Sequence, residues 1–257
     1  MNTLTLKPAR LLALGRSELT LLVRNRATLT VALLMPLVMV FVLQNSLAGY
    51  ALEGGAAAIG EATLTGGIGM VLVLVVYMNL VTAYVARREE LVLKRLRTGE
   101  ANDLEILAGS ALPAAVLAFV QIAVLVGAGA AVLDVRAPRN PLLLAAAVLA
   151  GTVLLAALGA ATSAVTRTVE SAGLTTMPLF LVSVVGSGVF VPVDTMPGTL
   201  ASVCELLPLS GVMTLVRAGW LGTSGEQDLL GAALTTLAWA VISVFAVQRW
   251  FRWEPRR

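Results

Sequence analysis

Six long apolar runs that contain no charged residue most constrain how this chain folds. A helix needs about 20 apolar residues to cross the ~30 Å hydrocarbon core of a bilayer, and every run reaches roughly that length. None alternates with the two-residue period of a membrane β-barrel strand. We therefore predict an all-α integral membrane protein of six transmembrane helices, at about 27–47, 63–86, 109–133, 141–166, 171–190 and 229–248.

The composition agrees with this class and excludes several kinds of site. Of the 257 residues, 58% are hydrophobic and 13% are charged, against about 25% charged residues in soluble domains. There is no histidine, and Cys204 is the only cysteine, so a histidine metal site, a cysteine metal cluster and an intramolecular disulfide are excluded. The sequence also lacks the glycine-rich phosphate-binding loop, so we expect no enzymatic activity and no cofactor bound by this chain itself.

The Lys and Arg residues predict the orientation. Fifteen of the eighteen lie in the N-terminal segment, the loops after spans two and four, or the C-terminal tail. Because cytoplasmic loops carry the excess of Lys and Arg, we expect both termini in the cytoplasm and the protein in the inner or plasma membrane. The chain then divides into a cytoplasmic segment at 1–26, a six-span domain at 27–248 and a basic tail at 249–257.

The segment at 1–26 precedes the first span and is basic. Arg10, Ser17 and Arg24 recur every seven residues on one face, with Leu12 and Leu19 roughly opposite. This pattern favours an amphipathic helix lying in the membrane interface. A plain basic flank of the first span is the alternative.

The stretch "RREELVLKRLRTGEANDLEILAG" at 87–109 follows span two and is the most informative cytoplasmic segment. Thr98 and Gly99 break one helix, and Asn102 or Asp103 is suited to capping a short new one. Its apolar side chains have no core of their own to fill, which favours docking into a groove on a cytoplasmic partner. Contact with lipid is the alternative. The predicted docking residues are Glu100, Asn102, Asp103, Leu104, Glu105, Ile106 and Leu107.

The stretch "GSGVFVPVDTMPGTLASVCELLPLSGVMTLVRAGWLG" at 186–222 lies between spans five and six. It is half apolar, and its prolines break or end helices. We predict two short helices that dip into the outer leaflet and cap the bundle, with Leu206, Leu207 and Leu209 facing the bundle and the charges at the mouth. An ordinary outer loop is the alternative. The residues of this predicted outer gate are Pro192, Asp194, Pro197, Glu205, Leu206, Pro208 and Arg217.

Few residues mark a path through the membrane. Asn79 and Gln121 lie in the middle of spans two and three and are candidates for polar contacts in a cavity. An interhelical hydrogen bond is the alternative. The absence of ionisable residues inside the spans argues against an ion-coupled secondary transporter. That class and a non-transporting scaffold stay open.

The stretches at 87–110 and 186–222 resemble the corresponding segments of the membrane subunit of ABC-2 type exporters, a group that includes daunorubicin-resistance permeases. The second stretch is the closer match: its "SGVFVP", "MPGTL" and following proline are similar to the family pattern before the last span. The similarity extends over essentially the whole chain, from the interface helix to the last span. The first stretch departs from the family pattern, because "TGEANDLEIL" replaces a proline-containing turn.

The resemblance implies roles for both segments. The outer pair would be re-entrant helices that help to close the exit of a translocation path, and the first loop would be the coupling helix on a cytoplasmic ABC ATPase dimer that binds ATP and Mg²⁺. The family works as a pair, so a second copy or a sister permease is implied, and no nucleic-acid partner is expected. The apolar path suggests export of a hydrophobic or amphipathic cargo such as a drug, antibiotic or lipid.

Overall fold

A computed structural model describes residues 55–99, 102–132, 137–188, 197–222 and 225–254, together with isolated positions between 20 and 42. Within these residues the chain is helical and contains no strand, which confirms the all-α prediction. The elements are α3 (Gly55–Val71), η1 (Leu72–Met78), α4 (Asn79–Glu89), α5 (Val92–Arg97), α6 (Asp103–Val132), α7 (Pro141–Val165), α8 (Val169–Gly186), α9 (Gly198–Glu205), α10 (Pro208–Leu221) and α11 (Glu226–Trp250).

Five stretches of helix in the described residues are long and apolar enough to cross a bilayer, and they correspond to the predicted spans two to six. The predicted interface helix and the first span, at 27–47, lie outside the described residues apart from isolated positions. The five stretches are Gly60–Glu89, Asp103–Gly129, Pro141–Val165, Val169–Gly186 and Glu226–Trp250.

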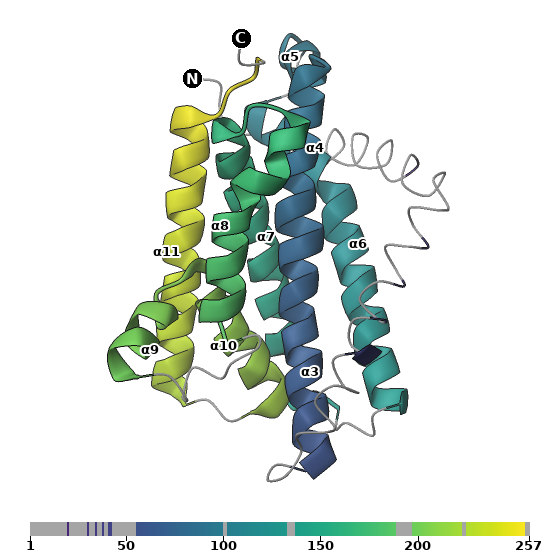
Figure 1. Ribbon diagram of the computed structural model, residues 1–257, viewed down its shortest axis with the longest axis vertical. Coiled ribbons are helices and arrows are strands. Elements are labelled where there is room, and N and C mark those ends of the chain that lie inside the picture. The colour runs from purple at the N-terminus through teal and green to yellow at the C-terminus, as the bar shows by residue number, and fades with distance from the viewer. Residues whose placement is uncertain are drawn as a thin grey trace.

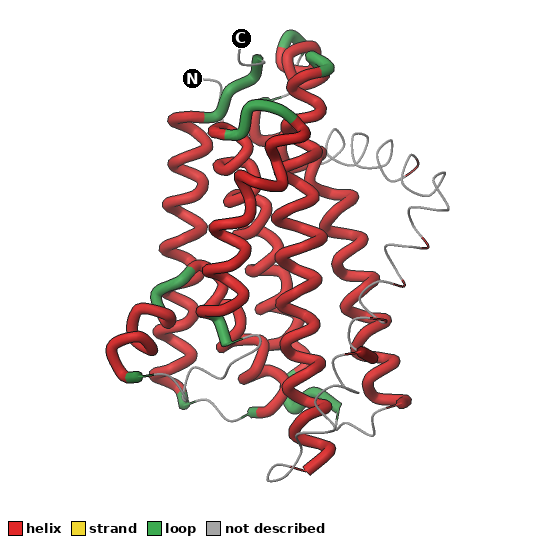
Figure 2. The backbone as a smooth tube through the Cα atoms, in the orientation of Figure 1, coloured by secondary structure: helices red, strands yellow, loops and turns green. Residues whose placement is uncertain are grey.

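The long helices lie side by side and leave two ends that carry different short elements (Figure 1). One end, called here the α5 end, holds α5, the turn between α7 and α8 and the tail at 251–254. The other, called the α9 end, holds α9, the end of α10 and the turn before α7. The tube view shows the same long helices, in red, running between the two ends (Figure 2). The element α5 and the element α9 therefore lie toward opposite ends of the bundle.

The core follows α7, which packs against η1, α4, α10 and α11. Leu154 and Leu155 on α7 are buried with Leu72 on η1 and Val212 on α10. Most of the large side chains on the outer faces of α8 and α11 are exposed apolar residues, among them Leu174 and Phe245. Such surfaces suit contact with lipid chains rather than water.

Span two contains a seven-residue π-helix, η1, in its middle. π-Helical turns are rare and occur frequently at functional sites. The hydroxyl of Tyr77, the sixth residue of η1, lies 3.2 Å from the hydroxyl of Thr162 on α7. This contact ties the irregular turn to the helix at the centre of the bundle.

Local sequence explains where α7 and α10 begin and end. The side chain of Asn140 accepts the Leu143 N–H at 3.0 Å, and Pro141 occupies the first turn of α7, as N-terminal caps and first-turn prolines do. Gly222 ends α10 with φ of 68°, a conformation that glycine adopts without a steric penalty. The backbone N–H groups of Arg139 and Asn140 donate to the carbonyls of Trp220 and Gly219, which joins the two elements at the α9 end.

Candidate functional site at the two ends of the bundle

At the α5 end, span two leaves the bundle through a buried arginine. Arg88 is only 1% exposed. Its Nη1 donates to the Ser163 carbonyl at 2.8 Å, and its Nη2 donates to the carbonyls of Thr166 and Arg167. These carbonyls lie at the C-terminal end of α7. There the last carbonyl oxygens of a helix lack partners within the helix and carry a partial negative charge. Arg88 therefore caps α7 from a neighbouring helix.

The next residue, Glu89, makes the complementary contact. Its carboxylate accepts the backbone N–H of Val169 at 3.2 Å, at the first residue of α8. An anion is favoured there, at the positive end of the helix dipole. The consecutive pair Arg88 and Glu89 thus holds both sides of the α7–α8 turn. In sequence the pair reads as part of a solvated charge cluster, and no pattern there identified it.

The turn between α4 and α5 exposes a leucine in an unusual conformation. Leu91 has φ of 59°, in the left-handed region, and is 40% exposed. The left-handed region costs an L-residue about 1–2 kcal/mol. Leu93 is fully buried and anchors α5, whereas Lys94, Arg95 and Arg97 are exposed. The result is a basic element with one apolar side chain at its tip.

The start of α6 corrects the predicted docking helix. No separate short helix forms at 102–107, because Asp103 begins the 30-residue helix that crosses the membrane. Glu105 and Ile106 are both 0% exposed and Leu107 is buried. The prediction that Ile106 and Leu107 present a free apolar surface is therefore wrong. Of the three apolar residues proposed there, Leu104 alone is exposed, at 42%. Glu100 lies outside the described residues.

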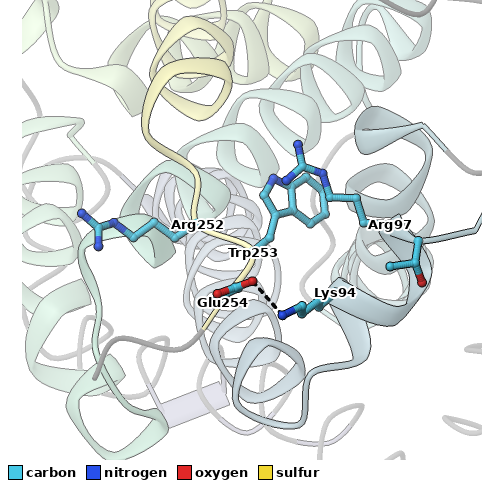
Figure 3. Close-up of a pocket in the computed structure, with 6 residues that line it drawn as sticks. Lys94, Arg97, Arg252, Trp253 and Glu254 are labelled. Carbon is cyan, nitrogen blue, oxygen red and sulfur yellow. Dashed lines mark ion pairs between the residues drawn. The ribbon is translucent and has the colours of Figure 1, made fainter.

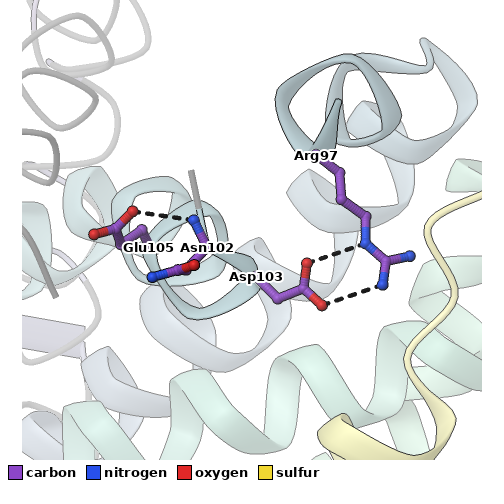
Figure 4. A network of polar contacts seen from close by, with 4 residues as sticks. All are labelled: Arg97, Asn102, Asp103 and Glu105. Atoms are coloured by element: carbon purple, nitrogen blue, oxygen red, sulfur yellow. Dashed lines mark hydrogen bonds and ion pairs between the residues drawn. The ribbon is translucent and has the colours of Figure 1, made fainter. Parts of the chain in front are cut away.

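The polar residues of this segment form two contacts that fix where α6 begins (Figure 4). The Glu105 carboxylate accepts the Asn102 backbone N–H at 3.0 Å, which is half of a capping box. The Arg97 guanidinium donates to both carboxylate oxygens of Asp103, at 3.1 and 3.3 Å. Arg97 therefore joins α5 to the first turn of α6.

On the α9 side of the bundle, α9 and α10 meet at a bend of 91°, beside Trp239 in the middle of α11. Pro197 is the N-cap of α9, and Pro208 lies in the first turn of α10. The pair of short helices predicted for this segment is therefore present. Glu205, the last residue of α9, is exposed. Pro192 and Asp194 lie outside the described residues.

The orientation of the leucines at this bend differs from expectation. Leu209 is fully buried and Leu207 is partly buried, but Leu206 is 67% exposed. The prediction that Leu206 faces the bundle is wrong, because the bend at 206–207 turns it outward. Its carbonyl accepts the indole Nε1–H of Trp239 on α11 at 2.7 Å. Leu206 therefore holds the bend through its backbone rather than its side chain.

α10 is held much more firmly than α9. A Cβ atom on Gly211 would lie 2.6 Å from the Ala232 carbonyl oxygen, so α10 and α11 touch backbone to backbone there. The half-buried Arg217 donates to the carbonyls of Ser187, at 3.0 Å, and Gly188. It therefore caps α8 as Arg88 caps α7. α9, in contrast, leaves Leu200 and Val203 exposed.

The two polar candidates for the path do not lie together. Asn79 is exposed on the surface of the bundle, whereas Gln121 is 2% exposed inside it. Among the described residues, the two side chains therefore do not line a common polar cavity. In the described residues no group of three or more Cys, Asp and Glu is arranged to hold a metal ion.

Comparison with known proteins identifies the family. The model of the family described as ABC-2 type transporter matches residues 9–221, a range that includes the helices from α3 to α10 and ends before α11 and the tail. No individual curated protein matches the chain. The chain belongs to the ABC-2 type transporter family, and it is a multi-pass membrane transport component rather than an ATPase itself.

Proposed function

We propose that this chain is the permease subunit of an ATP-driven exporter, and that a separate ABC ATPase binds at the α5 end and supplies the energy. ATP and Mg²⁺ bind to that partner. The permease works in a pair, with a second copy or a sister subunit, and moves a hydrophobic or amphipathic cargo out of the cytoplasm or the inner leaflet. Membership in the ABC-2 type transporter family supports the permease role.

The distribution of charge supports an α5 end in the cytoplasm. Among the described residues, the α9 end carries two cations, Arg139 and Arg217, and the α5 end carries eight. Cytoplasmic ends of membrane proteins carry this excess. The eight are Arg87, Arg88, Lys94, Arg95, Arg97, Arg167, Arg249 and Arg252.

The exposed, left-handed Leu91 is the observation that carries the docking role. Strained backbone at an exposed position is a recurrent mark of functional sites. The strain here presents an apolar side chain at the tip of a basic element. A partner surface with an apolar pocket and an acidic rim would be complementary to it. Leu104 is a second exposed apolar residue in the neighbouring turn of α6.

The packing at the α9 end supports a gate whose moving part is α9. α10 is wedged between α7 and α11 and is capped onto α8 by Arg217. α9 is short, contacts its neighbours little and presents an apolar face outward. Elements with few buried contacts open at the lowest free energy. Opening of the exit therefore requires displacement of α9 while α10 stays in place.

The docking role is tested by Leu91→Asp, with Leu142→Asp as the matched control. Leu142 is an exposed leucine at the opposite end of the bundle. The tagged permease is purified in mild detergent from native membranes, and Mg²⁺-dependent ATP hydrolysis that copurifies is measured. An unpaired charge in a buried contact costs several kcal/mol, so Leu91→Asp should lose at least about tenfold in copurifying activity. Unchanged activity in Leu91→Asp, or equal loss in the control, contradicts this docking site.

A further inference from the structure

We propose that the C-terminal tail at 251–254 is a strap that holds the α4–α5 turn in the geometry that the ATPase recognises, with Trp253 as its positioning residue. The proposal rests on the proposed docking role of the α5 end. The tail lies beyond residues 9–221, the part of the chain that the family model matches. It is therefore a feature of this chain that the family assignment does not explain.

The tail turns away from α11 at a defined point. Phe251 is the C-cap of α11, with φ of −63° and ψ of 130°, and its N–H donates to the Val247 carbonyl at 2.9 Å. The backbone becomes extended there and crosses the end of the bundle toward α5 (Figure 1). The body of α11 packs against α7 and α10. The tail links the end of α11 to α5, which follows span two.

The first contact of the tail is with α4. The ring of Phe251 meets Tyr84 edge to face, with the ring centroids 6.2 Å apart. The buried Tyr84 hydroxyl in turn donates to the Leu107 carbonyl of α6 at 2.9 Å. Phe251 therefore sits beside a side chain that already joins α4 to α6.

The second contact is with α5. The Trp253 ring packs edge to face on Phe251, at 5.0 Å between centroids. The Arg97 guanidinium lies over the Trp253 ring, 4.8 Å from its centroid, a distance at which the cation and the ring attract. Arg97 also holds Asp103, so the indole supports the same guanidinium that positions the start of α6.

An ion pair completes the strap. The Lys94 ammonium lies 2.8 Å from the Glu254 carboxylate, and both side chains are largely exposed. An exposed pair of this kind contributes little by itself, so the aromatic residues carry most of the contact. Lys94, Arg97 and Thr98 on one side and Arg252, Trp253 and Glu254 on the other line a pocket between the tail and α5 (Figure 3).

The strap compensates for two weaknesses of the α4–α5 turn. α5 has six residues, far fewer than the roughly 12–15 at which an isolated helix becomes even marginally stable. Leu91 before it has the left-handed backbone conformation. An element of this kind keeps its geometry only through outside contacts, and Arg97 and Lys94 on α5 both contact the tail.

Three variants distinguish the loss of the strap contacts from a general loss of folding. Trp253→Ala removes the ring, Trp253→Phe keeps an aromatic ring, and Trp250→Ala removes the neighbouring exposed indole at the end of α11. In the permease alone, a spin label is attached at Arg95→Cys in a Cys204→Ser background. With the ATPase that copurifies with the wild type, hydrolysis is measured while ATPase concentration is varied.

The strap predicts a change in affinity without a change in the catalytic maximum. Trp253→Ala should make the label at 95 more mobile. It should also raise the ATPase concentration for half-maximal stimulation at least about fivefold, the lower end of what one cation–π and one aromatic contact supply together. The maximal rate at saturating ATPase should stay unchanged, Trp253→Phe should recover most of the affinity, and Trp250→Ala should match the wild type.

Two failures are distinguishable. If the wild type stimulates hydrolysis and Trp253→Ala leaves both the label mobility and the half-maximal concentration unchanged, the strap is refuted and the docking role remains. If Trp250→Ala has the same effect as Trp253→Ala, the contact is a general property of the end of α11 and the strap is again refuted. If no hydrolysis copurifies with the wild type, the proposed function itself fails.

Discussion

The guanidinium of Arg88 on α4 donates to the Ser163 carbonyl on α7 at 2.8 Å, inside a buried contact at the α5 end. This contact joins the segment that leads into α5, the proposed docking element, to the end of the central helix. Glu89 extends it to α8 through the Val169 N–H. A displacement of the α4–α5 turn therefore acts directly on the ends of two other spans.

Arg88→Met should lower the apparent melting temperature of the purified protein by at least about 6 °C. The change removes charge-assisted hydrogen bonds worth about 1.5–3 kcal/mol each, and 1 kcal/mol corresponds to about 2–4 °C in a chain of this size. Arg88→Lys should lower the melting temperature by a smaller amount, because lysine keeps the positive charge but lacks the two-pronged N–H donors of the guanidinium. The measurement is thermal unfolding in detergent, with the exposed Arg95→Met as the control. A shift as small as the control's would show that the buried contact is not a stabilising one.

Gly219→Ala should destabilise the bundle by roughly 1–3 kcal/mol, as overpacking does. A Cβ atom at Gly219 would lie 2.7 Å from the Leu144 backbone nitrogen. Gly231→Ala on α11 is the matched control, because its Cβ would meet nothing within 4 Å and alanine is the better helix former by about 0.5–1 kcal/mol. Thermal unfolding of both variants gives the comparison. Equal stability of the two variants would contradict the tight α7–α10 contact.

Trp239→Phe should loosen the bend between α9 and α10 with little loss of overall stability. The change removes the hydrogen bond to the Leu206 carbonyl, which is worth about 1 kcal/mol, and keeps an aromatic ring. We expect thiol labelling of Leu200→Cys, in a Cys204→Ser background, to quicken severalfold. Trp250→Phe serves as the control. An unchanged labelling rate in Trp239→Phe would mean that this bond does not hold α9.

The orientation is checked by labelling one residue from each end of the bundle. In a Cys204→Ser background, Thr199→Cys on α9 should react with a membrane-impermeant maleimide added outside intact cells. Thr98→Cys after α5 should react only after the membrane is opened. Both residues are exposed. Reaction of Thr98→Cys from outside would reverse the orientation and, with it, the assignment of the cytoplasmic end.

The length of the uncharged apolar runs was sufficient to predict the spans that the structure describes. Runs of about 20 apolar residues leave a helix as the structure that satisfies the backbone in a bilayer. The predicted 141–166 became Pro141–Val165, since Asn140 and Pro141 mark the helix start locally. The division of this segment into α9 and α10 was also predictable, because a proline interrupts the helix locally and Pro197 and Pro208 stand at the starts of the two helices.

Contacts between distant segments could not be predicted in this way. Ile106 has the same neighbours in sequence whether it starts a docking helix or continues into a span, and only tertiary packing buries it. Arg88 reads as a solvated charge until Ser163 and Thr166, some 75 to 78 residues later, lie beside it. The tail is a third case, since the pairing of Trp253 with Arg97 depends on where α11 ends.

Photo-cross-linking from position 91 tests the central claim, that the α4–α5 turn is the docking site of an ATPase, most directly. A photoreactive amino acid replaces Leu91 in native membranes, and the same replacement at Leu142 serves as the control. The account predicts that position 91 forms an adduct with an ATP-hydrolysing protein and that position 142 does not. Adducts with lipid alone at position 91, or the same ATPase adduct from both positions, would contradict it.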